Sequence, residues 1–76
     1  MVVIPREAVL ERETGPTAFI AENDVARLRP LSLGPAEGDR VVVRKGLQFG
    51  DRLIVKGGRD LIDGDRVVVQ YAESVP

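Results

Sequence analysis

Carboxylates and arginines are the side chains of this chain that could do acid–base or ionic chemistry, because the sequence has no cysteine and no histidine. That absence excludes thiol and imidazole catalysis and the common zinc ligand sets. The densest carboxylate group is Asp60, Asp63 and Asp65. A calcium loop needs oxygen ligands at alternate positions, and Leu61 and Ile62 interrupt that spacing. We interpret these aspartates as turn residues, and we expect no metal, no cofactor and no enzymatic activity.

Phosphate and nucleic-acid binding are also disfavoured. The eight glycines fit neither G-x-G-x-x-G nor G-x-x-x-x-G-K-[ST]. The net charge is -1, and the aromatic residues are Phe19, Phe49 and Tyr71. A nucleic-acid surface is normally basic and often aromatic, so we predict no nucleic-acid partner.

Arginines that alternate along predicted strands are the remaining group of interest. Arg27 and Arg29 alternate with Ala26 and Leu28, and Arg44 follows three consecutive valines. Outward arginines commonly form weak cross-strand pairs with acidic neighbours. The same outward position would suit a polar docking face for a protein partner, so we predict Arg27, Arg29 and Arg44 as partner-contact residues.

β-Strands must position these side chains, because no stretch keeps apolar residues at helical spacing for the three turns that a stable helix needs. Short aliphatic runs are instead separated by Gly, Asp and Pro. With 76 residues the chain can form one small domain. We predict an all-β, small β-barrel-like or split-barrel domain of about six short antiparallel strands.

Two local signals indicate how the first strands connect. The pair Asn23-Asp24 tolerates positive φ and predicts a tight hairpin. Apolar residues change from even to odd positions between Leu28 and Leu31, which predicts a bulge or bend near Arg29-Pro30. Residues 6–10 are compatible with one helical turn or with an extended arm.

The second half of the chain contains a threefold repeat of Gly-Asp-Arg followed by three aliphatic residues, at residues 38–43, 50–55 and 64–69. Glycine would supply the turn conformation, and aspartate would cap the turn with a side-chain hydrogen bond. Each aliphatic triplet would then form a short strand.

The connectors between the repeats carry large apolar side chains. We expect Leu47, and either Leu61 or Ile62, to point into the core. Residues 72–76 show no pattern and are predicted to fray, so the domain is delimited at residues 1–71. Met1 leads directly into a strand pattern without a leader, which suggests a piece of a longer chain.

Several pieces of the sequence, in their order and spacing, resemble the C-terminal part of periplasmic adaptor subunits. These subunits are also called membrane fusion proteins and serve resistance-nodulation-division (RND) efflux pumps and related ABC exporters. The resemblance runs from about Val2 to Val69. Its pieces are residues 4–9 (IPREAV), 17–20 (TAFI) with the polar hairpin that follows, 25–31 (VARLRPL), 46–57 (GLQFGDRLIVKG) and 63–67 (DGDRV).

The resemblance implies that the chain is the membrane-proximal domain of a periplasmic adaptor. Such an adaptor bridges an inner-membrane transporter, of the RND or ABC type, to an outer-membrane channel. The domain would pack on the transporter beside neighbouring adaptor protomers and would carry no catalytic residue. The glycines that carry over, as structural turn positions alone, are Gly46, Gly50, Gly57 and Gly64.

The resemblance also implies that the small barrel is completed by a strand from the far N-terminal part of the adaptor. The chain alone would then expose an unpaired strand edge, and such edges pair with other chains. We therefore expect self-association, or a weakly stable monomer.

Two other function classes stay open at this point. A free-standing SH3-like or OB-like β-barrel that binds peptide or nucleic acid would need a basic, aromatic face, which the composition does not provide. A carboxylate enzyme or calcium module built on the three aspartates would reveal itself by calcium binding in calorimetry.

Overall fold

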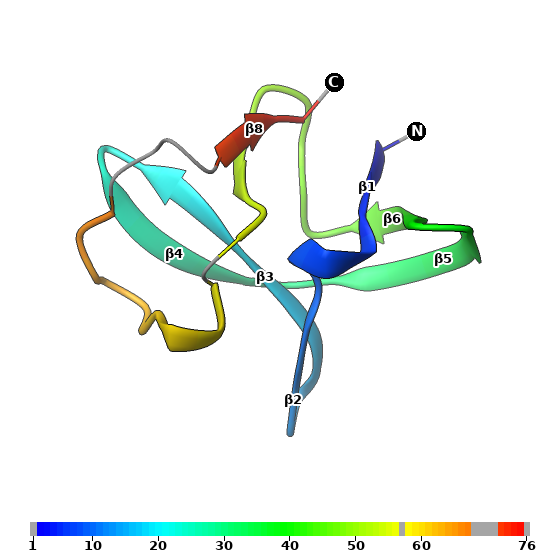
Figure 1. Cartoon of the computed structure of the whole chain (residues 1–76), viewed down its shortest axis with the longest axis horizontal. Helices are drawn as coiled ribbons and strands as arrows, with labels where there is room; N and C mark the ends of the chain where they lie inside the picture. Colours follow the sequence, from blue (N-terminus) through cyan, green and yellow to red (C-terminus); the bar gives the residue numbers. More distant parts are fainter. Residues whose placement is uncertain (1, 57, 68–71, 76) are drawn as a thin grey trace.

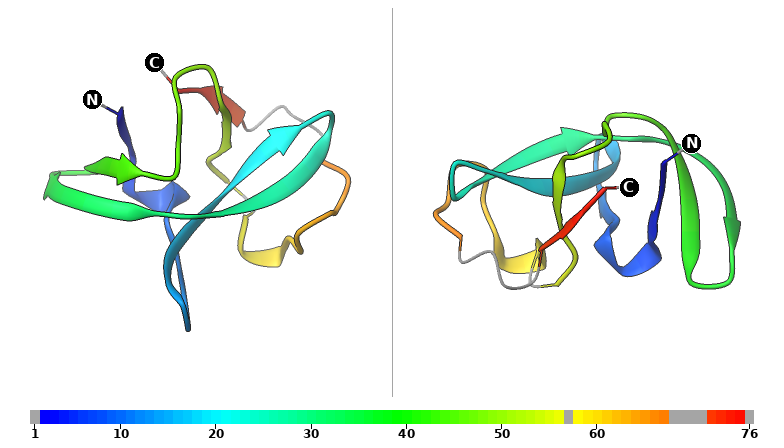
Figure 2. Two further views of the ribbon diagram at one scale, coloured as in Figure 1. Left: turned by 180° about the vertical axis from the view of Figure 1, so that it is seen from behind. Right: turned by 90° about the horizontal axis from the view of Figure 1, so that it is seen from above.

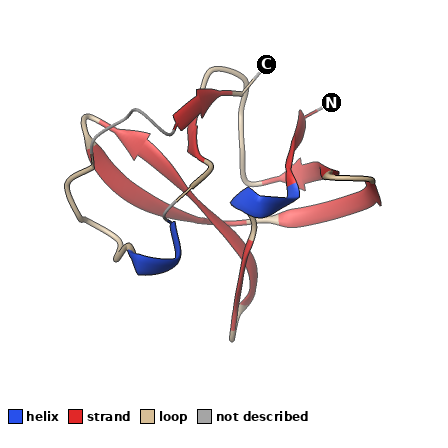
Figure 3. Cartoon of the chain, in the orientation of Figure 1, coloured by secondary structure: helices blue, strands red, loops and turns tan. Residues whose placement is uncertain are grey.

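The computed structural model describes residues 2–56, 58–67 and 72–75. Within these ranges the chain folds into antiparallel strands and two single-turn 3-10 helices, as Figures 1 and 3 show. The strands are β1 (Val2–Pro5), β2 (Leu10–Arg12), β3 (Gly15–Glu22), β4 (Val25–Pro30), β5 (Ser32–Glu37), β6 (Arg40–Lys45), β7 (Arg52–Ile54) and β8 (Ala72–Ser74). The helices are η1 (Arg6–Ala8), which follows Pro5, and η2 (Gly58–Asp60). The predicted all-β class is confirmed.

Two sheets make up the fold. The first has three strands in the order β1-β6-β5, and the second has five strands around β3. On one edge β3 pairs with β4, and along its other edge it pairs first with β2 and then, at Ile20, with β7. β8 extends this sheet beyond β7. The sheets do not close into a barrel, and the two termini lie near each other in all three views (Figures 1 and 2).

The predicted hairpin and bend are both present. Asn23 and Asp24 have φ of 53° and 62°, and Glu22 pairs directly with Val25, so the loop between β3 and β4 has two residues. This geometry matches the twist of the flanking strands and explains the choice of Asn and Asp. The bend falls at Leu31, which is buried where the chain leaves the second sheet and enters the first.

The core consists of two clusters, one on each face of β3. Alternate residues of a strand point to opposite faces, so Ala18 and Ile20 belong to the cluster between the sheets, whereas Phe19 belongs to the cluster on the other face. Phe19 is 1% exposed, and burial of such a side chain contributes about 2–3 kcal/mol. The run TAFI is therefore continuously buried because both faces of its strand are covered.

The connectors and the C-terminal segment add to these clusters. Leu47 is buried, and Leu61 packs against the Phe19 cluster whereas Ile62 is 70% exposed. The structure differs from the predicted frayed tail, because Ala72–Ser74 forms β8 against β7 and Val75 is buried. The tail is held because β7 offers it an edge to pair with and Val75 fills a place in the core. Of the third aliphatic triplet, residues 68–69 lie outside the described residues.

Candidate protein-interaction surface

Arg27 and Arg29 lie on β4 and share one face of the second sheet. They stand opposite Ile20 and Ala18 of β3, and directly opposite residues in an antiparallel pair lie on the same face. Arg27 is exposed, and the Nη2 atom of Arg29 lies 3.5 Å from the Oε2 atom of Glu22. Since 40% and 55% of these two side chains are exposed, the pair contributes at most about 1 kcal/mol. Both arginines therefore remain accessible to a partner.

Arg44 lies on the other sheet, near the end of β6. Val41 and Val43 are buried in the core, so the alternating residues Val42 and Arg44 face away from it. The Arg44 side chain passes over Gly34, where a Cβ atom would lie 3.0 Å from its Nε atom. The three predicted contact residues thus come from two sheets, with Arg27 and Arg29 together and Arg44 on the outer face of the β1-β6-β5 sheet.

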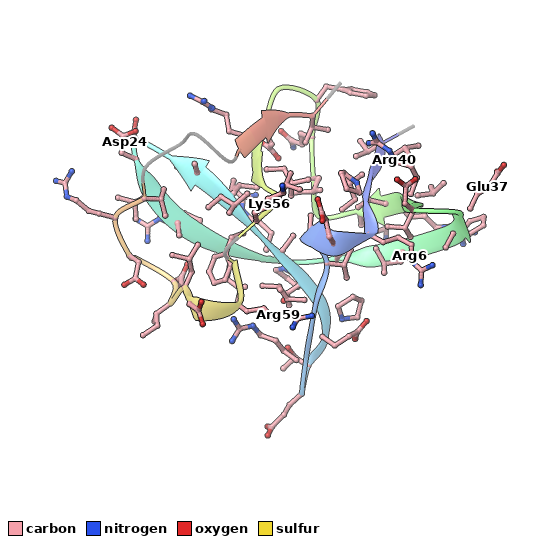
Figure 4. All side chains as sticks on the ribbon, viewed as in Figure 1. Arg6, Asp24, Glu37, Arg40, Lys56 and Arg59 are labelled. Carbon is pink, nitrogen blue, oxygen red and sulfur yellow. The ribbon has the colours of Figure 1, made fainter. Side chains whose placement is uncertain are left out.

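Sequence reasoning missed a shallow groove on that outer face. It has a volume of about 410 Å³, and its apolar lining comes mainly from Val3, Pro35, Ala36 and Val42. Glu37 and Arg40, labelled in Figure 4, are its charged lining residues, on the hairpin that joins β5 and β6. The sequence signal was the aliphatic triplet itself, because the central valine must face outward when its two neighbours face the core.

Gly46 sits where two chain connections cross. A Cβ atom here would collide with the carbonyl oxygen of Pro30 and would lie 2.8 Å from the Cδ2 atom of Leu31. The φ of Gly46 is 112°, a conformation that other residues rarely adopt. The connection from β6 to β7 can therefore pass tightly over the bend at Leu31. Gly57 lies outside the described residues.

Gly50 and Gly64 occupy the same position in two turns of the same design, with φ of 92° and 98°. In the 48–51 turn, an Oδ2 atom of Asp51 accepts the Gln48 amide at 2.9 Å. In the 62–65 turn, Asp65 accepts the Ile62 amide in the same way at 3.0 Å. The predicted aspartate cap is thus present in the second and third repeats.

The first repeat is built differently. Glu37 pairs directly with Arg40, so Gly38 and Asp39 form a two-residue hairpin loop between β5 and β6. Their carbonyl oxygens accept hydrogen bonds from Arg6, one from its side chain at 3.2 Å and one from its backbone amide at 2.8 Å. The repeated sequence therefore specifies a turn in each case, but the turn type depends on the strands that it joins.

Two of the three aspartates of the 58–66 region accept hydrogen bonds from backbone amides. Besides the cap made by Asp65, the Oδ1 atom of Asp63 accepts the Leu28 amide at 2.8 Å, and Asp60 is exposed. Across the described ranges, no three acidic side chains gather in a way that could hold a metal ion. These contacts support the interpretation of the aspartates as turn residues.

The described part of the chain contains no helix that is long and apolar enough to cross a membrane. β1 is an outer strand of the first sheet. Among the described residues, β1 pairs with β6 along one edge, and no strand pairs with its other edge.

A two-sheet, open all-β domain with this strand order is consistent with a permuted SH3-like fold. Residues 1–60 match the family model described as "RND MFPs, C-terminal permuted SH3 domain". The chain therefore belongs to the membrane fusion proteins of RND efflux systems, as the sequence resemblance indicates. Members of this family are generally periplasmic, membrane-associated and non-enzymatic, and they partner with transporters and other protomers in RND pumps.

Two curated relatives are called multidrug resistance protein MdtE, from Escherichia coli O157:H7 and from Escherichia coli strain K12. Each is 42% identical to this chain over 59 residues, which is 75% of this chain and 15% of the relative. The chain thus spans a small part of the length of the relatives that it matches.

Proposed function

We propose that this chain is the membrane-proximal domain through which a periplasmic adaptor docks on an inner-membrane RND transporter and couples it to an outer-membrane channel. The observation that carries this proposal is the family match over residues 1–60. In this role the domain acts by binding and by transmitting conformational change, with no catalysis, no cofactor and no nucleic acid. The transporter and the neighbouring adaptor protomers are its partners.

The open edge of β1 supports a domain that is completed by another part of its own adaptor. Val2 and Ile4 are buried in the core, whereas the strand lacks a described neighbour on its outer side. A strand from the N-terminal part of the parent adaptor would pair there and remove an aggregation-prone edge. The matched relatives, of which this chain covers 15%, have ample additional chain for such a strand.

Arg27, Arg29 and Arg44 are the proposed contact to the transporter. Arg27 and Arg29 share one face, and Arg44 adds a positive charge on the outer face of the other sheet. Guanidinium groups suit this role because they bind carboxylates with two parallel hydrogen bonds. The polar surface then complements acidic side chains of the transporter.

The test is charge reversal in the full-length parent adaptor. A triple variant with Arg27→Glu, Arg29→Glu and Arg44→Glu should reduce both copurification of the transporter and drug resistance of the cells at least about tenfold, since several charge pairs become repulsive. A matched control reverses three other exposed arginines, Arg52, Arg59 and Arg66, with the same change in net charge. If both triple variants lost copurification and resistance equally, or if the first variant lost neither, Arg27, Arg29 and Arg44 would not be the transporter contacts.

A further inference from the structure

The edge of β4 that points away from β3 is covered by residues 63–67, which we call the strap. Figure 1 shows this segment, in orange, close to β4. The backbone amide of Ala26 donates to the carbonyl oxygen of Asp65 at 2.7 Å, and the amide of Gly64 donates to the carbonyl oxygen of Ala26 at 2.7 Å. Val67 donates to the carbonyl oxygen of Asp24 at 2.9 Å.

The Asp63 side chain extends this cover to a position that the strap backbone does not reach. Its Oδ1 atom accepts the Leu28 amide at 2.8 Å, in the place where a neighbouring strand would present a carbonyl oxygen. Backbone groups of alternate residues in β4 point away from β3, and after Ala26 and Leu28 the next such residue is Pro30, which has no N–H. Every outward amide of β4 is therefore bonded or absent.

The strap is held by packing as well as by hydrogen bonds. Leu61, just before it, and Val67, at its end, both pack against the cluster of Phe19, Ala26 and Ile54. Val25 and Arg66 form an isolated antiparallel bridge in the middle of the contact. The strap thus occupies the position of an additional strand beside β4, although it forms no strand of its own over this length.

Two other edges are protected in ways that natural sheets commonly use. β5 contains Pro35 and two register shifts, and β2 is three residues long with exposed Glu11 and Arg12. β1 is also short and ends in Pro5, but it has no charged residue and no register shift against β6.

We propose that the strap is an edge guard that prevents β4 from pairing with a second copy of this chain, and that the Asp63 carboxylate is its decisive contact. The guard keeps strand addition away from the edge of a six-residue strand whose pairing with β3 has no register shift. The guard itself depends on the described contacts alone, whereas the assignment of β1 as the edge that stays available rests on the proposed function.

The first test follows the Leu28 amide of this chain by hydrogen exchange and NMR. Asp63→Ala should speed exchange of this amide at least about tenfold, because a hydrogen bond to a charged acceptor is lost, while Phe19 amide exchange changes less. Asp63→Asn keeps an acceptor oxygen at the same place and should restore most of the protection. Phe49→Ala, at the equivalent position of the 48–51 turn, is the matched control and should leave Leu28 unchanged.

The second test detects pairing of β4 between copies by cysteine cross-linking, which is clean here because the chain has no cysteine. Single cysteines at Arg27 or Arg29 should form few disulfide-linked dimers in the otherwise natural chain, and severalfold more when combined with Asp63→Ala. A cysteine at Val3 reports β1 pairing, which Asp63→Ala should leave unchanged. Unchanged exchange at Leu28, or equal cross-linking at β4 with and without Asp63, would overturn the guard. Neither result depends on pump assembly, so failure of the guard would not contradict the proposed function, and failure of the proposed function would not contradict the guard.

Discussion

The 48–51 and 62–65 turns share one hydrogen-bonding pattern, but each bonds to a different segment of the chain. In the first, the amide of Gly50 donates to the carbonyl oxygen of Val75, and the amide of Val75 donates to that of Asp51, both at 2.8 Å. In the second, Gly64, Ala26 and Asp65 form the same pair of hydrogen bonds at 2.7 Å. The repeat in the sequence is therefore also a repeat in the way that each turn bonds to a distant segment of the chain.

The two turns differ at the residue that precedes the glycine. In the first turn this residue is Phe49, which is 63% exposed, and in the second it is Asp63, which bonds to the Leu28 amide. They also differ upstream, because Gly46 is clamped over Leu31 while its counterpart fourteen residues later, Asp60, is exposed. Equal local geometry thus serves two purposes, anchoring the C-terminal segment in one copy and covering an edge in the other.

The largest predicted effect on stability is at Gly46, upstream of the first turn, and it should be absent at the counterpart residue Asp60. Gly46→Ala should lower the free energy of unfolding by at least about 3 kcal/mol, since it adds a strained positive φ and a collision with the Pro30 backbone. Asp60→Ala, at the counterpart position, should change it by less than about 0.5 kcal/mol. Urea denaturation monitored by circular dichroism measures both, and similar values for the two variants would contradict the difference in anchoring.

A smaller effect, equal in the two copies, is expected at the turn glycines. Gly50→Ala and Gly64→Ala should each cost about 1–2 kcal/mol, because both residues have positive φ, while an added Cβ atom would meet no described atom within 4 Å beyond the adjoining residues. The cost then comes from backbone strain alone. Values that differ by more than about 1 kcal/mol in urea denaturation would show that the turns are not equivalent.

The aspartate caps should give the next smaller pair of effects. Asp51→Ala and Asp65→Ala should each destabilise the fold by about 1 kcal/mol through loss of the side-chain bond to the turn amide. Asp51→Asn and Asp65→Asn retain an acceptor and serve as controls in thermal denaturation. A much larger loss for one member of the pair would point to a contact that the repeat does not share.

The smallest effect is expected at Phe49. Because 63% of this residue is exposed, Phe49→Ala should change the free energy of unfolding by less than about 0.5 kcal/mol. Asp63→Ala should cost about 1 kcal/mol, since the Leu28 amide loses its partner. If calorimetric unfolding showed Phe49→Ala to be the more destabilising of the two, the proposed difference between the two turns would be contradicted.

Much of this architecture could be predicted because it depends on local chemistry. Asn23 and Asp24 indicate a two-residue hairpin through their tolerance of positive φ, and the change of phase before Leu31 indicates the bend. The capping role of Asp51 and Asp65 follows from the Gly-Asp pairs.

The long-range contacts could not be predicted in the same way. The order of Val75 depends on hydrogen bonds to the 48–51 turn, and the role of Asp63 depends on an amide 35 residues away. Neither partner is indicated by periodicity or by turn propensity. The separation of Arg44 from Arg27 and Arg29 likewise depends on which sheet each strand joins, a property of topology and not of spacing.

Sedimentation velocity of the chain over a range of concentrations tests most directly whether this is an incomplete domain of a larger adaptor. The open edge of β1 predicts self-association that increases with concentration, with a low midpoint of thermal unfolding at low concentration. The Val3→Cys variant should cross-link in the associated species. A compact monomer that persists at high concentration and unfolds only at high temperature would contradict the account.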